Sequence, residues 1–177
     1  MAVWLEAALN GPWTRGRQPL IPITVEEVVR DGIACAQAGA AILHLHAFDP
    51  ATGRQNDDPD TYKAIFEGIR EKVDAIVYPT LPFCQSARAF GPDAVSARYR
   101  AVEALGAQGL MEWGVVDPGT INLATFAEAE SGLPGSVYAN PGEHVLRGLE
   151  LAARHGYVPS YAIYEPGFLR LGAAMAR

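Results

Sequence analysis

The sequence predicts an α/β fold in which the strands of a parallel sheet alternate with helices. Short apolar segments alternate five times with longer segments that carry helix-start signals, which is the pattern of repeated strand–helix units. The apolar segments are nearly continuous runs, as expected for strands that helices cover on both faces. The 177 residues are expected to form one domain, spanning residues 1–177.

Local signals place the individual elements. Thr24 is the expected N-cap of the first helix, with Glu27 at the capping-box spacing and Gly39 just past the helix end. Asp93 is a suitable cap for the third helix, and Pro141 suits the first position of the fourth. The expected strands are residues 2–8, 40–46, 75–79, 109–114 and 161–165. The expected helices are about residues 24–38, 58–72, 93–105 and 141–155, with another starting near residue 167.

Two parallel architectures fit five strand–helix units. A flavodoxin-like, doubly wound sheet would be complete with five strands. A (β/α)8 TIM barrel takes about 250 residues, so the chain would hold only its first five units. The last expected helix runs to Arg177 without a capping residue after it. This ending favours the N-terminal part of a TIM barrel, truncated at the C-terminus.

The composition excludes several classes of partner. The net charge is −6 and the basic residues are scattered, so neither nucleic acid nor an anionic membrane is expected to bind. No apolar run approaches the roughly 20 residues of a membrane span. The N-terminus lacks the features of a signal peptide, and Cys35 and Cys84 belong to no C-x-x-C motif. We therefore expect free thiols and a cytoplasmic location.

Polar side chains gather where the expected strands end, which is where parallel α/β proteins place their chemistry. These residues are Glu6, Asn10, His44, His46, Asp49, Thr80, Glu112 and Glu165.

His44 and His46 end the second expected strand, in the stretch GAAILHLH. Side chains alternate along a strand, so the two imidazoles face the same side, roughly 7 Å apart, while Leu45 faces the helices. They are two of the three protein ligands of a catalytic zinc site, or else a pair of hydrogen-bonded structural histidines. His144 and His155 are expected on the surface. The candidates for a third ligand are Glu6, Asp49, Glu112 and Glu165.

The chain contains the stretches A-A-L-N-G, P-x-x-P-I-T-x-E-E, and A-G-A-A-I-L-H-L-H followed by D-P-x-T-G-R. In these stretches it resembles the β-keto acid cleavage enzyme family. The later stretches VYANP and GYVPSYAIYEPGFL are also similar to the family, whereas residues 80–135 match only loosely.

The resemblance implies a TIM barrel that holds a divalent metal, usually zinc, through His44, His46 and a glutamate from a late strand. It implies condensation of a β-keto acid with acetyl-CoA to give acetoacetate and an acyl-CoA. Thr80 falls where the family has a serine or threonine, and is expected to contact substrate and assist catalysis, while Asn10 is expected to bind substrate. A homo-oligomer, such as a tetramer, is also implied.

The sequence departs from the family in several places. The late G-x-E-D segment, with the glutamate ligand, has no counterpart in the chain. Ala47 and Phe48 follow the histidines where the family has a small apolar residue and an arginine. Trp13, Phe48 and Phe83 suggest an apolar substrate tail, although such aromatics can equally pack the barrel mouth. Glu112 is expected to shape the substrate pocket. Glu165 is expected in the catalytic site.

Three hypotheses remain open at this stage. The first is a metal-dependent, acetyl-CoA-dependent acyltransferase that cleaves β-keto acids. The second is a metal-dependent aldolase or lyase that needs no CoA. The third is non-enzymatic: an inactive truncated barrel fragment, or a small doubly wound binding domain.

Overall fold

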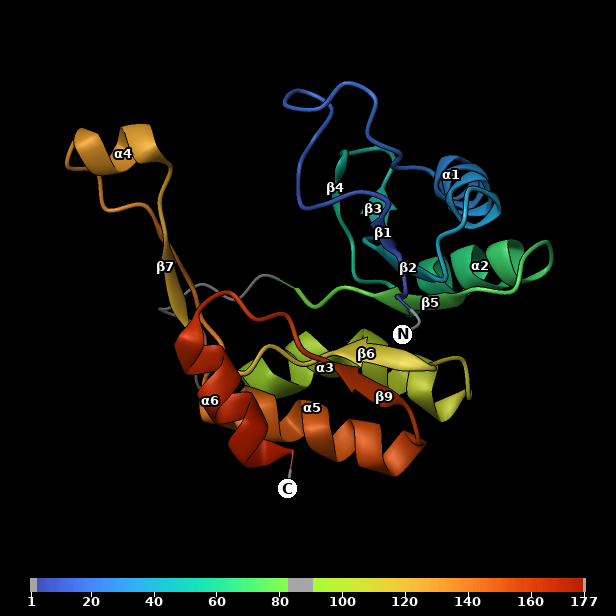
Figure 1. The fold of residues 1–177 in the computed structure, drawn as a ribbon. Coiled ribbons are helices and arrows are strands. Elements are labelled where there is room, and N and C mark those ends of the chain that lie inside the picture. The colour runs from blue at the N-terminus through green and yellow to red at the C-terminus, as the bar shows by residue number, and fades with distance from the viewer. Residues whose placement is uncertain (1–2, 83–90, 177) are drawn as a thin grey trace.

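A computed structural model describes residues 3–82 and 91–176, and it is an α/β protein with parallel strands (Figure 1). The strands are β1 (Glu6–Ala8), β2 (Ile42–Leu45), β3 (Phe48–Asp49), β4 (Arg54–Gln55), β5 (Ile76–Pro79), β6 (Trp113–Val115), β7 (Ile121–Leu123), β8 (Ser136–Tyr138) and β9 (Val158–Ser160). The helices are α1 (Val25–Gln37), α2 (Pro59–Arg70), α3 (Pro92–Ala107), α4 (Phe126–Glu130), α5 (Gly142–His155) and α6 (Pro166–Met175).

The parallel strands lie side by side in the order of the sequence. β2 pairs with β1 on one side and with β5 on the other, so that His44 lies between Ala8 and Tyr78. β6 contacts β5 and pairs in parallel with β9. A flavodoxin-like sheet would place its first strand between the second and third. Here β2 takes that central position, so the doubly wound alternative is wrong for these strands.

The hydrophobic core lies between the strands and helices α1, α2, α3 and α5, which pack against one another in that order along the outer face (Figure 1). Leu43 and Leu45 of β2 are fully buried on this face, against Phe66 and Ile69 of α2. Strand alternation therefore leaves His44 and His46 on the opposite face, as the sequence predicts.

The start and end of α1 agree with the sequence, whereas the expected cap of the third helix is wrong, because Gly91 is the N-cap of α3 and Asp93 lies within its first turn. Thr24 caps α1 in a capping box with Glu27, and Gly39 follows the helix with a φ of 112°, a value that favours glycine. Pro141 is the N-cap of α5 and not its first helical residue.

Strands four and five are shifted from the expected positions. β6 begins at Trp113, so Glu112 precedes the strand instead of ending it. β9 ends at Ser160, so Glu165 lies well beyond the strand, at the N-cap of α6. The ends of β6 and β9 are set by the register of their parallel pairing, in which Trp113 is the partner of Val158. Pairing between distant segments fixes these ends, and apolar composition alone does not reveal it.

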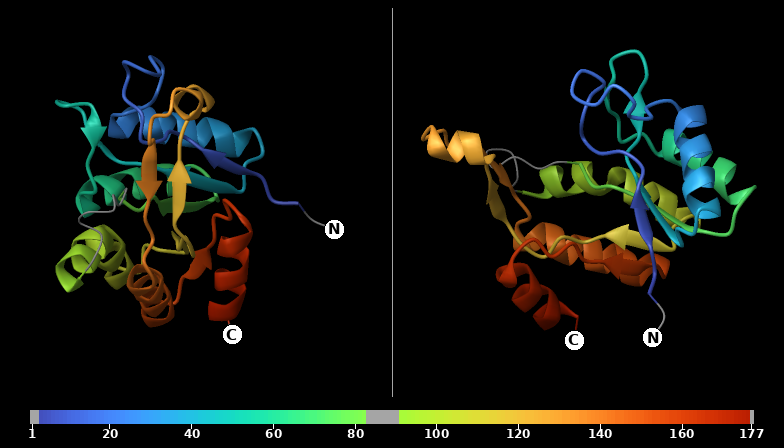
Figure 2. Two further views of the ribbon diagram at one scale, coloured as in Figure 1. Left: turned by 90° about the vertical axis from the view of Figure 1, so that its left-hand side faces the viewer. Right: turned by 45° about the horizontal axis from the view of Figure 1, so that its top comes forward.

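Two antiparallel hairpins are additional to the expected elements. β3 and β4 form a short hairpin directly after the histidines. Residues 118–140, expected as a loop, contain the pair β7–β8 with α4 at its tip. This arm projects from the body of the molecule on the side away from α1 and α2 (Figures 1 and 2). No helix among the described residues has the length and apolar character needed to cross a membrane.

Replacing Thr24 by Ala is expected to lower the free energy of unfolding by about 1 kcal/mol, because the capping box at the start of α1 is lost. Urea titration measures the change. Thr125→Ala is the matched control, since Thr125 caps α4 with the same motif but α4 buries no residue. An equal loss in both variants would contradict the expectation that only α1 contributes its cap to global stability.

Candidate functional site

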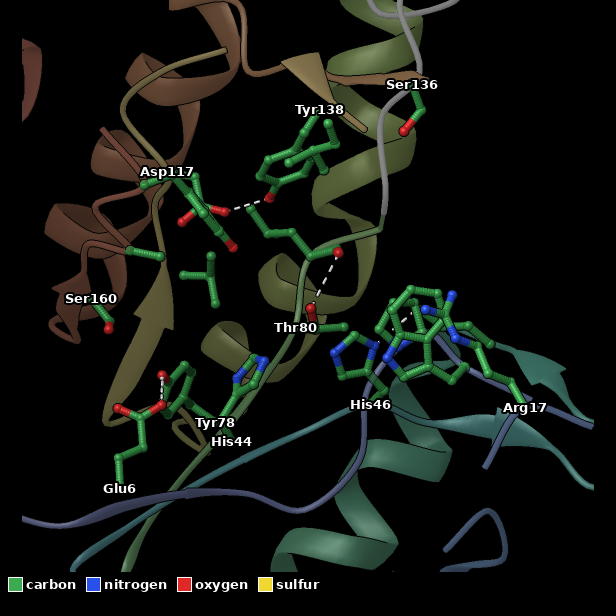
Figure 3. A pocket seen from close by; sticks show the side chains of 18 of the residues that line it. Glu6, Arg17, His44, His46, Tyr78, Thr80, Asp117, Ser136, Tyr138 and Ser160 are labelled. Carbon is green, nitrogen blue, oxygen red and sulfur yellow. Dashed lines mark hydrogen bonds between the residues drawn. The ribbon is translucent and has the colours of Figure 1, made fainter. Parts of the chain in front are cut away.

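A pocket of about 850 Å³ opens at the carboxyl ends of the parallel strands (Figure 3). β1, β2, β5, β6 and β9 each contribute side chains at or just beyond the strand, and the β7–β8 arm supplies a further wall. His44 and His46 both line it. The edge of the sheet at which the sequence predicts polar side chains therefore carries a cavity, which Glu6, His44, His46 and Thr80 line.

The two histidines lie close together inside this pocket. Their ring centroids are 5.5 Å apart, with the rings nearly perpendicular. The ring of Tyr78, on the neighbouring strand β5, is 4.8 Å from that of His44. The pair is thus held by the register of two parallel strands and not by a flexible loop.

A chain of hydrogen bonds behind His46 selects its tautomer. The Nδ1 atom lies 2.9 Å from Oε1 of Gln55, whose amide nitrogen donates to Asp57 at 2.9 Å. The hydroxyl of Tyr62 also donates to Asp57. Because the carboxylate fixes the orientation of the Gln55 amide, the amide oxygen must accept from Nδ1–H of His46. This leaves the lone pair of His46 on Nε2.

Both imidazoles are held in the neutral form. Burial, followed by the neighbouring His46 ring, lowers the pKa of His44 to about 3. Burial also lowers the pKa of His46, although Gln55 and Asp57 oppose the shift. In the described part of the chain, His44 Nδ1 is buried without a hydrogen-bond partner. Neutral imidazoles with available lone pairs are the form that binds metals.

The histidine pair therefore fits two ligands of a metal site. Second-sphere partners of the Gln55 type hold a ligating histidine in the correct tautomer. The described residues contain no group of three His, Cys, Asp or Glu side chains placed to hold a metal ion. Of the proposed third ligands, Glu6 lines the pocket and accepts a hydrogen bond from Tyr78 at 2.6 Å. Asp49 accepts hydrogen bonds within the turn of the β3–β4 hairpin.

Thr80 and Trp13 lie in the pocket. Thr80 follows β5, and its hydroxyl makes only a long, 3.3 Å hydrogen bond to the carbonyl of Leu81. The Trp13 ring is about half exposed, and the guanidinium of Arg17 lies 3.7 Å from its centroid. Both residues are thus accessible to a bound molecule.

Asn10 has a different position from the one expected. Its amide nitrogen donates to the carbonyls of Pro22 and His46, and its oxygen accepts from the backbone N–H of His46 at 2.7 Å. Asn10 lines a smaller neighbouring hollow and not the main pocket. Because its amide is occupied by backbone groups, Asn10 positions His46.

The structure places three other expected site residues outside the pocket. Phe48 is 2% exposed and packs with Ile21 and Ile23, because the β3–β4 hairpin turns it inward. Glu112 lies at the amino end of β6, where it forms a 2.7 Å ion pair with Arg70. Glu165 does not line the pocket. Phe83, the third residue behind the expected apolar tail, lies outside the described residues, as does Cys84.

The wall opposite the histidines holds two polar residues that the sequence analysis does not identify. Asp117 follows β6 and is 4% exposed, and it accepts a hydrogen bond from the hydroxyl of Tyr138 on β8 (Figure 3). Burial raises the pKa of Asp117, while the Tyr138 hydroxyl and the Arg98 charge oppose that shift. Asp117 lies shortly after the end of β6. Because the sequence analysis places the fourth strand at residues 109–114, it does not identify Asp117 as a residue at a strand end.

Arg98 anchors this wall from behind. Its guanidinium is buried and donates to the Asn140 side chain at 2.7 Å and to the carbonyls of Pro82 and Ala139. His144 lies 3.2 Å from it and is 1% exposed, so the expectation that His144 is a surface residue is wrong.

Parallel strands that deliver two neutral imidazoles into one pocket define an α/β protein with an enzyme-like site. The family comparison is more specific. The chain belongs to the β-keto acid cleavage enzyme family, whose model matches residues 2–177.

Individual relatives cover shorter stretches. A 3-keto-5-aminohexanoate cleavage enzyme from Fusobacterium nucleatum is 37% identical over 68 residues, which are 38% of this chain and 25% of that protein. A 3,5-dioxohexanoate:acetyl-CoA acetone transferase from Paraburkholderia graminis is 34% identical over 64 residues (36% and 21%). A 3-oxoadipate:acetyl-CoA acetyltransferase from Cupriavidus necator is 35% identical over 80 residues (41% and 26%). The matched stretches thus span about a quarter of the length of these relatives.

A solved structure shares the fold. The ternary complex of ObcA with a C4-CoA adduct and oxalate aligns with a TM-score of 0.65 and 21% identity, covering 90% of this chain and 34% of that one. At this identity the likeness concerns the fold alone.

The histidine pair is expected to make folding stability depend on pH. The folded-state pKa of His44, about 3, lies below the ordinary histidine value of 6.5, so below pH 6.5 the unfolded chain binds more protons. The contribution of His44 to the free energy of unfolding is therefore full above pH 6.5. It falls towards pH 3 by about 1.4 kcal/mol per pH unit for one histidine. Urea titrations in a chelating buffer are expected to show a shallower pH slope for His44→Gln. An unchanged slope would contradict the assignment of His44 as a buried neutral imidazole.

Proposed function

We propose that the chain is part of a metal-dependent β-keto acid cleavage enzyme that uses acetyl-CoA. The observation that carries the proposal is the pair of neutral imidazoles, His44 and His46, on one face of β2 beside Thr80 in a pocket of about 850 Å³. Family membership supports the reaction class.

We propose, further, that the five parallel strands and their helices are the first units of a (β/α)8 barrel. The strands lie side by side in the order of the sequence, and the helices cover the outer face. The pocket opens at the carboxyl ends of the strands, which is the end that holds the chemistry in barrel enzymes.

In the proposed reaction, the C2–C3 bond of the β-keto acid breaks. The acyl group passes to the sulfur of CoA, and the acetyl group of acetyl-CoA joins the remaining carboxymethyl fragment as acetoacetate. Two relatives whose names include acetyl-CoA support this choice of co-substrate.

Each residue has a specific task in this proposal. His44 and His46 would hold a divalent metal, zinc or a similar ion, which when bound acts as a Lewis acid towards a ketone oxygen. Gln55 keeps His46 in the tautomer with a free Nε2. The Thr80 hydroxyl, only weakly bonded to Leu81, is available to donate to a substrate oxygen on which negative charge develops. Trp13 lines the pocket and would contact the substrate.

Activity is expected only when both substrates are present. Acetoacetate should form from a β-keto acid such as 3-oxohexanoate when acetyl-CoA is added, and Thr80→Val should lower kcat by about a hundredfold. Thr52→Val, in the β3–β4 turn, is the control with unchanged rate. Consumption of 3-oxohexanoate without acetyl-CoA would instead support an aldolase or lyase. The absence of product under all conditions would identify the chain as an inactive fragment.

Metal binding is tested separately from activity. Isothermal titration with Zn²⁺ is expected to show one site per chain, lost in His44→Ala and in His46→Ala. Gln55→Leu is expected to weaken binding about tenfold or more, because the hydrogen bond that fixes the His46 tautomer is removed. His155→Ala is the control outside the pocket. Equal Zn²⁺ affinity in the wild-type chain and all variants would reject the histidine pair as the ligands.

A further inference from the structure

The charges that line the main pocket are unevenly distributed. Glu6, Asp117 and Glu128 contribute carboxyl groups, whereas Arg17 is the only lysine or arginine among the described lining residues. Glu6 and Asp117 lie on the side formed by β1 and β6, and Figure 3 places Arg17 at the other side, next to His46. Glu128 interacts with Arg17 at longer range, so among the described lining residues Arg17 is the one arginine or lysine that an anionic group entering the pocket meets.

Arg17 is pre-positioned for such a group. Its guanidinium carbon lies over the Trp13 ring, 3.7 Å from the ring centroid. This contact restricts a side chain that would otherwise sample many rotamers. Among the described residues, no carboxylate lies within ion-pair distance of Arg17, although Glu128 interacts with it at longer range. Its donors are therefore available to a ligand.

The neighbouring Arg15 shows the contrast. Arg15 lies in the same loop, but it donates to both carboxylate oxygens of Glu27, the capping-box residue of α1. Arg15 does not line the main pocket. One arginine of the loop is thus committed to the fold, while the other faces the cavity.

We propose that Arg17 is the anion-binding residue of the pocket and that it orients the substrate, receiving a carboxylate or phosphate through its planar fork of N–H donors. The inference rests on the proposed function, because both proposed substrates are anions. The carboxylate belongs to the β-keto acid and the phosphates belong to CoA. In either case the ligand lies with its anionic group near Trp13 and its uncharged part towards the wall formed by β6.

The test compares binding of each ligand to the complete chain by isothermal titration. 3-Oxohexanoate and acetyl-CoA are titrated separately into wild type, Arg17→Met, Arg17→Lys and Arg15→Met. Loss of a charge-assisted hydrogen-bonded contact should weaken one ligand about tenfold or more in Arg17→Met. Arg17→Lys should be intermediate, and Arg15→Met should bind as wild type. The ligand that loses affinity identifies the anionic group that Arg17 receives.

Salt dependence gives a second readout that a structural role would not change. The wild-type affinity for that ligand should fall with ionic strength, and the fall should be smaller in Arg17→Met. Equal affinities and equal salt slopes in wild type and Arg17→Met would overturn the role of Arg17 alone. If the wild-type chain bound neither ligand, the proposed function and this inference would both be overturned.

Discussion

The alternation of side chains along β2 is the constraint on which the site depends. Leu43 and Leu45 are fully buried against the helices, and this burial fixes which face of the strand turns inward. His44 and His46 must then face the pocket, because a shift by one residue would place two imidazoles in the apolar core. The hydrophobic effect that stabilises the sheet therefore also orients the residues proposed to bind metal.

The pocket walls are stabilised in different ways. The histidine wall depends on backbone pairing between β1, β2 and β5, with Gln55 fixing one ring from behind. The facing wall depends on a buried polar network in which Arg98 joins the end of the arm to α5. Such a network demands that each partner be satisfied, since an unpaired buried charge is costly. The β7–β8 arm is thus a structural part of the cavity, although the sequence analysis predicts no strand or helix between residues 114 and 141.

Several local features of the structure are predictable from the sequence, whereas features set by distant pairing are not. The cap at Thr24 and the shared face of the two histidines follow from neighbours a few residues away. The ends of β6 and β9 follow from their mutual register, so Glu112 was assigned to the pocket while Asp117, which lines it, was missed. The inward position of Phe48 is not predictable for a related reason, because a two-residue strand pairing turns its ring inward.

Asn10 fixes both ends of the loop between β1 and α1. One carboxamide joins the start of this loop to Pro22 near its end and to the backbone of His46. The two ends of the loop are therefore fixed relative to the histidine by three hydrogen bonds that do not involve residues 11–21. Under the proposed function, substitutions at the exposed positions of that stretch would alter what the pocket binds while His46 keeps its position. Selectivity and chemistry would then be able to change separately during evolution, because the Asn10 side chain fixes the histidine independently of the rest of the loop.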